Sequence, residues 1–248
     1  MAKKFVIVED NNDKYTFEAI LRYMETSDIE VKSTEKEDID WYIRSAESNI
    51  DSPTGLKDSL FSAFKELRKE EHDKIGIIWD LDNFTNEQRL LQINNALKLA
   101  VADFQKENIG VTITFDKIEA TNTFAKITIN DVDAEIACHF VQYKGVGELE
   151  DLLKAIKAKN SDIADCIDAK LPECLDEKEE TSLRNKDLVK LWINHYQRYD
   201  TLPKKNRKDA FTRWDNMMKN RSDIFDFGKD EVIELKELKA FLKQLIIN

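Results

Sequence analysis

The chain has 248 residues, of which 42% are hydrophobic and 35% are charged, and its formal net charge at pH 7 is -11. This composition is typical of a globular protein and excludes a wholly disordered chain. The acidic balance also excludes broad electrostatic attraction to nucleic acid, because affinity for a polyanion comes largely from Lys and Arg. Any binding of nucleic acid must therefore depend on a local basic patch or on a metal ion.

The N-terminal apolar run is short. Residues 5–8 are apolar and are followed at once by Glu9 and Asp10, which predicts a buried strand rather than a secretory signal peptide. No stretch approaches the roughly 18 uninterrupted apolar residues of a membrane span. We therefore expect a cytoplasmic protein that does not contact a membrane. The three cysteines lack Cys-x-x-Cys spacing, so neither a disulfide framework nor a zinc site is expected.

The first part of the chain alternates predicted strands and helices. The apolar runs at 5–8 and 75–79 are continuous, as in strands that are buried on both faces of a parallel sheet. Each is followed by acidic residues and then by apolar residues at helical spacing. Thr85 and Gln88 form a capping-box pattern that opens the second of these helices. A short strand is predicted at 29–31 and a helix at 56–67, whereas residues 34–51 receive no assignment.

Strand signals continue to about residue 143 and then nearly vanish. Asn130 and Asp131 predict a tight turn of a β-hairpin. The strands expected here are 111–115, 124–129 and 134–143, and the helices expected after them are 148–156, 163–171, 183–199, 205–218 and 232–247. The predicted fold is α/β, with a mainly parallel sheet flanked by helices and a hairpin region in residues 1–157. A helical portion at 158–248 packs on it, with a soft boundary that is also compatible with one compact unit.

Acidic residues follow two of the predicted parallel strands. Glu9 comes after the first, and Asp80 and Asp82 follow the strand at 75–79. Ligands of such sheets bind beyond the carboxyl ends of the strands. If the strand continues through Asp82, the two aspartates project from one side and offer hard oxygen ligands that suit Mg²⁺ or Mn²⁺. The structural alternative is that these acids form turns and cap helices, but clustered carboxylates repel one another and need a cation.

The ordered set of acids resembles the Toprim superfamily. Residues 8–13 are similar to its first motif, a glutamate after a hydrophobic strand, and residues 77–82 are similar to its D-x-D strand. The resemblance spans about residues 5–153. The chain departs from the pattern at Asp10, where Toprim domains usually have glycine, and this disfavours a close approach of phosphate.

Within that superfamily, the pattern is most similar to OLD-type nucleases and small uncharacterised Toprim-like proteins. The resemblance implies a Toprim-like, Rossmann-like fold and magnesium-dependent phosphodiester chemistry in which two metal ions can take part. It implies a metal ligand or general acid/base at Glu9, metal ligands at Asp80 and Asp82, and candidates for a second metal at Asp13 and, in the third acidic element after Gly147, at Glu150.

Full-length OLD nucleases also carry an ATPase. The six glycines of this chain form neither a P-loop nor a G-x-G-x-x-G motif. The resemblance therefore implies that any ATPase acts in trans, as a partner.

Residues 203–221 form the concentrated basic region of the sequence, with seven basic and two acidic residues. The candidate nucleic-acid-binding residues are Lys204, Lys205, Arg207, Lys208 and Arg213, and the aromatic residues Tyr199, Phe211 and Trp214 lie among them. Such a mixture can hold phosphates and stack on bases, but a solvated helix face with aromatics packed inward gives the same pattern. By the resemblance, Lys208 is the candidate for the late catalytic lysine of OLD-type sites, with Lys204 or Lys205 as alternatives.

The leading hypothesis is a metal-dependent nuclease or related phosphotransfer enzyme that acts on DNA or RNA. An alternative is a catalytically weak Toprim-like module that serves as a binding or regulatory subunit of a defence or repair system. A minor alternative is a haloacid-dehalogenase-like phosphatase that uses Asp80 as its nucleophile. That family places its D-x-D on the first strand, whereas here a strand and helices come before it.

Overall fold

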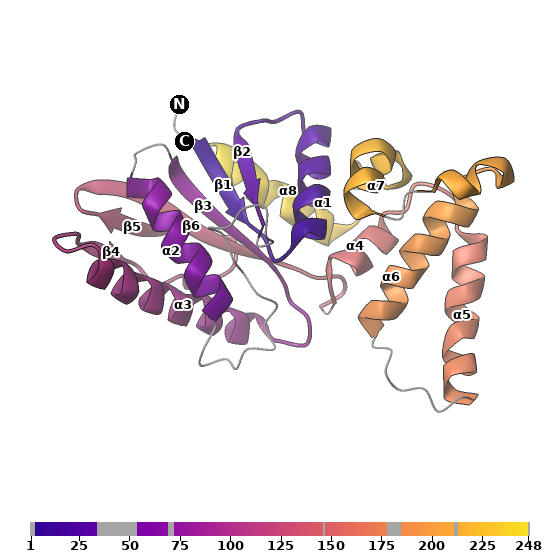
Figure 1. Ribbon diagram of the computed structural model, residues 1–248, viewed down its shortest axis with the longest axis horizontal. Coiled ribbons are helices and arrows are strands. Elements are labelled where there is room, and N and C mark those ends of the chain that lie inside the picture. Colours follow the sequence, from indigo (N-terminus) through magenta and orange to yellow (C-terminus); the bar gives the residue numbers. More distant parts are fainter. Residues whose placement is uncertain are drawn as a thin grey trace. The chain divides into compact units, whose positions relative to one another are not determined.

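The computed structural model divides the chain into two compact units. Unit 1 comprises residues 1–141 and 237–248, and unit 2 comprises residues 142–236 (Figure 1). The division differs from the predicted one at residue 158, because the last strand already ends at Val141 and the C-terminal residues return to the sheet. The residues described are 3–33, 54–68, 72–145, 147–177, 185–210 and 213–247; the unassigned stretch 34–51 and Phe211 lie outside them.

Unit 1 is built on a six-stranded sheet with the order β2-β1-β3-β6-β5-β4. The strands are β1 (Lys3–Ile7), β2 (Ile29–Lys32), β3 (His72–Asp80), β4 (Ile113–Phe115), β5 (Ala125–Ile129) and β6 (Val132–Val141). The first three pairings along this order are parallel and the last two are antiparallel. The predicted α/β class, with a mainly parallel sheet and a hairpin, is confirmed. Asn130, in the hairpin turn, has a φ of 54°, as short hairpin turns require.

Helices cover both faces of the sheet (Figure 1). They are α1 (Asn11–Tyr23), α2 (Thr54–Arg68), α3 (Asn86–Glu107) and α8 (Ile233–Ile246), which belongs to unit 1 from residue 237 onward. Side chains of α2 and α3 form the main core with alternate residues of the strands, such as Phe5 and Ile75. The intervening residues face α8. A Cβ at Gly76 would lie 2.9 Å from Leu245 and 2.7 Å from Val6, so only glycine lets α8 pack this closely.

The strand order creates a switch point between β1 and β3. From β1 the chain passes through α1 to β2 on one side, and then through α2 to β3 on the other side of β1. At such a point the connections leave the sheet in opposite directions and open a crevice beyond the carboxyl ends of the strands. Glu9 follows β1 by two residues and Asp80 is the last residue of β3, so both acids lie at this switch point.

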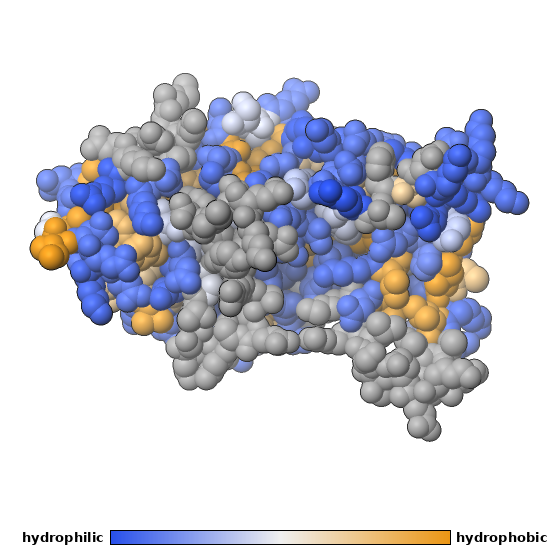
Figure 2. Space-filling model, viewed as in Figure 1, coloured by the Kyte–Doolittle hydropathy of each residue, from blue (hydrophilic) through white to orange (hydrophobic). Residues whose placement is uncertain are grey.

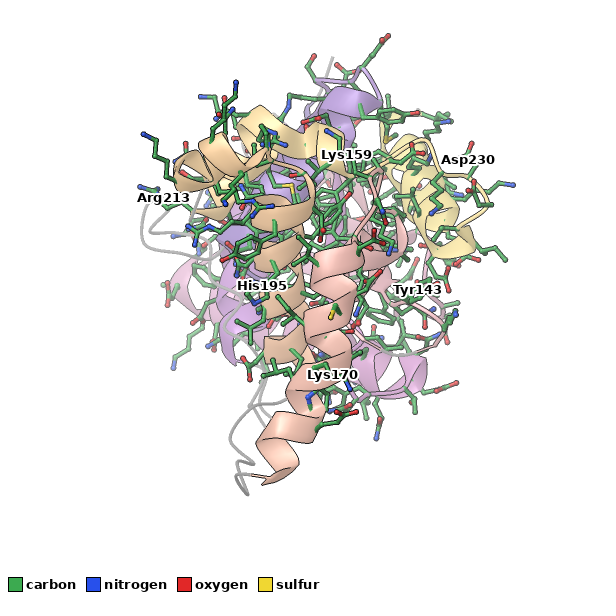
Figure 3. The ribbon with its side chains drawn as sticks, turned by 90° about the vertical axis from the view of Figure 1, so that its right-hand side faces the viewer. Tyr143, Lys159, Lys170, His195, Arg213 and Asp230 are labelled. Carbon is green, nitrogen blue, oxygen red and sulfur yellow. The ribbon has the colours of Figure 1, made fainter. Side chains whose placement is uncertain are left out.

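Unit 2 is helical in its described residues. It contains α4 (Leu149–Ala155), α5 (Asp162–Glu177), α6 (Asn185–His195), the π-helical turn η1 (Tyr196–Asp200), the 3₁₀ helix η2 (Lys204–Asp209), α7 (Trp214–Arg221) and the 3₁₀ turn η3 (Ser222–Ile224). Helices α5 and α6 run side by side (Figures 1 and 3). The rings of Trp192 and Tyr196 stack in its core with centroids 4.9 Å apart.

One predicted helix of unit 2 is wrong. Residues 205–218 do not form a continuous helix, because η2 ends at Asp209 and α7 begins only at Trp214. Between them, Ala210 and Arg213 both have extended backbone, with ψ angles of 131° and 132°. The apolar residues whose spacing suggested one helix thus belong to two separate elements.

The visible face in Figure 2 is dominated by hydrophilic residues, with small hydrophobic patches. One exposed apolar residue is Ile109, which follows α3 and is 97% exposed. None of the helices in the described part of the chain combines the length and the apolar composition that crossing a membrane requires.

Candidate metal centre

The acids predicted from the first and third strands lie at neighbouring strand ends. In the parallel pairing of β1 with β3, Ile7 lies beside Ile77. Continued by two residues, this register brings Glu9 level with Trp79, the residue before Asp80. Glu9, Asp80 and Asp82 are all half-buried. The carboxyl edge of unit 1 therefore carries the three acids that the sequence singled out.

A buried arginine connects these acids. Arg89 lies in the first turns of α3 and is 0% exposed, and its guanidinium interacts electrostatically with the carboxylates of Asp82, Glu9 and Asp80. Asp82 forms an ion pair and hydrogen bond with Nη2. Since the guanidinium also interacts electrostatically with Glu9 and Asp80, and β1 pairs with β3, the three acids lie near one another at this edge.

Two aromatic rings and an amide hold the Arg89 side chain. Its guanidinium carbon lies 4.3 Å from the ring centroid of Trp79 and 4.3 Å from that of Phe84. Nη1 donates a hydrogen bond to Oε1 of Gln92 at 3.0 Å. Cation–π contacts on a desolvated guanidinium are among the stronger ones, so this side chain is fixed in place.

Burial lowers the pKa of the Arg89 guanidinium, and the carboxylates of Asp82, Glu9 and Asp80 oppose this effect by favouring the charged form. An arginine remains protonated at neutral pH even in such surroundings. Carboxylate oxygens such as those of Glu9 and Asp80 are the hard ligands that a divalent cation of the Mg²⁺ type prefers.

The condition under which Asp80 and Asp82 would project from one side, a strand that continues through Asp82, is not met. The strand ends at Asp80, and Asp82 has a φ of 51°, which is a left-handed conformation. Aspartate is one of the few residues other than glycine that adopt this conformation readily. The turn directs Asp82 to Arg89, so the even spacing of a strand does not explain how Asp80 and Asp82 meet.

Asp13, a candidate ligand for a second metal, takes part in a helix cap. Oδ1 of Asp10 accepts a hydrogen bond from the Asp13 backbone at 3.0 Å, and Oδ2 of Asp13 accepts one from the Asp10 backbone at 3.4 Å. This capping box starts α1. Asp10 has a φ of -140°, so the backbone at this position does not need the glycine of Toprim domains.

Glu150, the other candidate for a second metal, belongs to unit 2. It is only 6% exposed and lies in the first turn of α4, where Nζ of Lys190 approaches Oε1 to 3.4 Å. Carboxylate oxygens of Glu148 and Glu150 lie within 4.8 Å of each other. A shared role of Glu150 with the acids of unit 1 stays a prediction.

The five basic candidates also belong to unit 2, and the structure separates them into two groups. Lys204, Lys205 and Lys208 are exposed on η2 and make no ion pair with the described residues. Arg207 is half-buried, donates to the Tyr199 carbonyl at 3.2 Å and lies over the Tyr199 ring. Arg213 forms an ion pair with Asp215 at 3.0 Å. Figure 3 labels Arg213 and His195, which both belong to unit 2. The catalytic role predicted for Lys208 stays a prediction.

Sequence reasoning missed Arg89, although the sequence contains a signal for it. Arg89 occupies the same face of α3 as Ile93, Leu97 and Phe104, which are all buried. A charged residue within an apolar stripe at helical spacing is expected to be buried and therefore to need partners of opposite charge. Asp80 and Asp82 precede it by less than ten residues, which makes them the obvious partners.

A comparison with protein families finds one match. The family described as "Protein of unknown function (DUF3226)" matches residues 3–247, which is nearly the whole chain. No curated protein and no solved structure matches the chain. Because the match includes the sheet, Arg89 and the helices of unit 2, the chain belongs to the DUF3226 family.

Proposed function

We propose that this protein binds Mg²⁺ or Mn²⁺ at the carboxyl edge of unit 1 and uses it for phosphodiester chemistry on nucleic acid, as a cytoplasmic, nuclease-like Toprim protein. The observation that supports this most strongly is that Glu9, Asp80 and Asp82 lie at neighbouring strand ends beside one buried guanidinium, at the switch point of the sheet. Carboxylates at the carboxyl edge of a parallel sheet offer the hard oxygen ligands that a divalent cation of this type takes.

In this proposal Glu9 and Asp80 hold the ion. A bound divalent ion supplies Lewis-acid stabilisation of negative charge on phosphodiester oxygens. Glu9 is also the candidate to take or give a proton, since its half-buried carboxylate lies beyond the end of β1. Asp82 contributes through Arg89. Asp13 and Glu150 remain candidates for a second ion, with the reservation that each already has a protein partner.

The three exposed lysines of η2 support a nucleic-acid substrate. They lie within six residues of chain and have no acidic partner among the described residues. Lysines of this kind bind phosphates and release counterions, which makes binding sensitive to salt. We therefore propose that unit 2 holds the nucleic-acid backbone. An ATPase partner in trans belongs to the same proposal, because the chain has no P-loop.

Metal binding and cleavage test the proposal together. Mn²⁺ is titrated into the full chain and followed by electron paramagnetic resonance, and supercoiled plasmid, single-stranded DNA and RNA are incubated with the protein and Mn²⁺. We expect saturable Mn²⁺ binding and cleavage of at least one substrate, with both lost in Asp80→Asn. Asp133→Asn is the matched control, because it removes one carboxylate from unit 1 in the exposed hairpin.

The outcomes separate the candidate functions. Absence of Mn²⁺ binding in the wild-type chain would rule out the proposal. Binding without turnover on any substrate would favour the catalytically weak regulatory module, which the use of Asp13 in a helix cap and of Asp82 in an ion pair also favours. Trapping of a phosphorylated Asp80 would instead identify a phosphatase.

The lysines are tested by a salt titration of nucleic-acid affinity. The triple variant Lys204→Gln, Lys205→Gln and Lys208→Gln is compared with a control that removes three exposed lysines of unit 1, Lys98, Lys106 and Lys117. We expect the first variant to bind more weakly and to reduce the slope of log affinity against log salt by about two to three. Equal slopes in both variants would show that η2 is not the binding surface.

A further inference from the structure

We infer that unit 2 binds single-stranded nucleic acid, with the rings of His195 and Tyr199 stacking on unpaired bases while the lysines of η2 hold the phosphates. The inference rests on the proposed nucleic-acid substrate and specifies its class. The observation that carries it is a stacked group of three side chains, His195, Tyr199 and Arg207, which connects α6, the turn η1 and η2. Figure 3 faces unit 2 and labels His195 of this group.

The turn η1 separates an aromatic ring of the core from one near the surface. Tyr196 is 0% exposed, and its hydroxyl accepts a hydrogen bond from the Lys159 backbone at 2.9 Å and donates one to the Ile224 carbonyl at 2.8 Å. Tyr199 and His195 are instead half-buried. An aromatic residue packed inward thus describes Tyr196 but not Tyr199, which keeps part of its surface in contact with solvent.

The three side chains of the stacked group hold one another in place. His195 and Tyr199 are four residues apart, and their rings stack with centroids 5.7 Å apart and an interplanar angle of 25°. The guanidinium carbon of Arg207 lies 5.2 Å from the Tyr199 ring centroid, and its Nη2 donates to the Tyr199 carbonyl at 3.2 Å. Flat rings and guanidinium planes are the groups on which unpaired bases stack, with little dependence on base type.

Cations next to the stacked group in the chain lack acidic partners. Asp200, the acid nearest to it in sequence, uses its carboxylate to accept hydrogen bonds from the backbone of Ile163 and Ala164, both at 2.9 Å. It therefore serves the first turn of α5 and does not neutralise the neighbouring cations. The cations that form no ion pair with the described residues are Arg198, Lys204, Lys205 and Lys208.

The rings and the lysines favour different forms of nucleic acid. Lysines that bind only phosphates favour the duplex, because its charge density is higher than that of a single strand. A ring can stack on a base only where that base has left the duplex stack. A preference for the single strand over the duplex is therefore the property that the stacked group adds to the lysines of η2.

Fluorescence anisotropy with the full chain in EDTA measures this preference without cleavage. The fluorescein-labelled probes are oligothymidine, an abasic oligomer of the same length that keeps the phosphates, and a duplex of that length. We expect the wild type to bind oligothymidine at least about fivefold more tightly than the abasic oligomer, and more tightly than the duplex. Tyr199→Leu keeps the apolar bulk but removes the ring, so it should lose this fivefold difference and keep the affinity for the abasic oligomer. Tyr199→Phe should behave like the wild type.

Tyr143→Leu is the matched control. Tyr143 is another half-buried ring of unit 2, with Nζ of Lys144 5.2 Å from its centroid, and its removal should leave all three affinities unchanged. The triple lysine variant should instead lower the affinities for oligothymidine and the abasic oligomer alike, because it removes contacts with phosphates. Only the Tyr199 substitution is thus expected to change the ratio of the two affinities.

The outcomes separate this inference from the proposed function. Equal binding of oligothymidine and the abasic oligomer by the wild type, or tighter binding of the duplex, would overturn the inference and leave the binding of phosphates by η2 intact. A wild-type ratio in folded Tyr199→Leu would overturn it as well. Absence of binding to all three probes would also remove the proposed nucleic-acid substrate. If circular dichroism shows that Tyr199→Leu does not fold, His195→Leu decides: loss of the ratio supports the inference, and an unchanged ratio contradicts it.

Discussion

A buried arginine among acids in unit 1 contrasts with an aspartate among donors in unit 2. Arg89 interacts with three carboxylates at the edge of the sheet. Asp165, on α5, instead accepts hydrogen bonds from Ser161 Oγ at 2.6 Å, Lys157 Nζ at 3.0 Å and Trp192 Nε1 at 2.8 Å. In the first group several acids share one cation, and in the second several donors share one acid.

The difference separates the proposed metal centre from a cluster whose aspartate already accepts several hydrogen bonds. Burial raises the pKa of Asp165, but the hydrogen bonds from Ser161, Lys157 and Trp192 outweigh it and lower the pKa overall. The folded protein thus stabilises this charge with its own groups. At the edge of unit 1, three carboxylates act on one guanidinium, and the proposed divalent ion would be a further partner of these acids. Both clusters are acidic in sequence, and only their partners distinguish them.

The largest expected effect tests whether Asp80 and Asp82 have different tasks. Asp80→Asn removes a proposed ligand and should weaken Mn²⁺ binding at least about 100-fold, since even indirect partners of metal ligands change affinity by 10- to 100-fold. Asp82→Asn should weaken it only about tenfold, at the lower end of that range, because Asp82 acts through Arg89. Asparagine tolerates the φ of 51° at this position, so the backbone is preserved.

Isothermal titration calorimetry with Mn²⁺ measures both affinities, and urea unfolding measures the stability of each variant. Asp82→Asn should lose about 2 kcal/mol of unfolding free energy, as expected for a hydrogen bond between charged groups. Equal losses of Mn²⁺ affinity in the two variants would show that Asp82 is a direct ligand.

A second effect concerns a buried titratable group in the middle of the sheet. His139 is buried in β6, its Nδ1 lies 2.8 Å from Oδ1 of Asn122, and its ring stacks on Phe241. Burial lowers the pKa of His139 to about 4, compared with about 6.5 in an unfolded chain. Between these values the unfolded chain binds a proton that the folded one does not. His139 therefore costs stability as the pH falls from about 6.5 to about 4, by about 3 kcal/mol in all.

Urea unfolding at pH 7 and at pH 4 measures this loss in the wild type and in His139→Gln. The carboxylates titrate in both proteins, so the difference between them reports on His139 alone. We expect the wild type to lose about 3 kcal/mol more than the variant over this range. His195→Gln, on α6, is the control and should behave like the wild type. Parallel pH profiles of the wild type and His139→Gln would contradict the prediction.

The sheet of unit 1 could be predicted from the sequence because its signals are local. The apolar runs at 5–8 and 75–79 contain the buried parts of β1 and β3, and the Thr85 capping box predicted the start of α3. The hairpin followed from Asn130 and the strand-rich segments on either side. Periodicity and caps depend on neighbours within a few residues, which a single sequence displays directly.

The partners of the acids could not be predicted in the same way. Asp13 matched a metal motif, yet its carboxylate accepts from the backbone of Asp10, a choice that depends on the start of α1. Asp82 was assigned by strand spacing, but the chain turns there with a positive φ. Arg89 was visible as a charge in an apolar stripe, and its three acidic partners became known only from the tertiary structure. The pairing of donors with acids depends on the tertiary structure and cannot be seen in neighbouring residues of the sequence.

The next prediction concerns the start of α4, which positions Glu148 and Glu150. Gly147 has a φ of 98°, and a Cβ there would clash with the carboxylate of Asp151, whose Oδ2 accepts from the Glu148 backbone at 3.0 Å. Gly147→Ala should therefore lower the unfolding free energy by about 2 kcal/mol, from backbone strain and the lost hydrogen bond. Gly145→Ala is the matched control, because Gly145 has a similar φ of 84° but open space around an added Cβ. It should lower the unfolding free energy by about 1 kcal/mol. Equal losses in urea unfolding would show that the contact with Asp151 does not matter.

The smallest expected effect concerns Asp165 and tests whether its hydrogen-bonded cluster has only a structural role. Asp165→Ala removes the acceptor of the Trp192 indole, which is 1% exposed, but water can reach the other donors. We expect a loss of about 1 kcal/mol in urea unfolding and no change in Mn²⁺ affinity. Asp162→Ala, three residues earlier on α5, is the control: its carboxylate accepts from Asn160, so its loss should be smaller. If Asp165→Ala weakened Mn²⁺ binding as much as Asp80→Asn does, acids with complete sets of donors would also bind the ion, and the contrast between the two regions would not identify the metal centre.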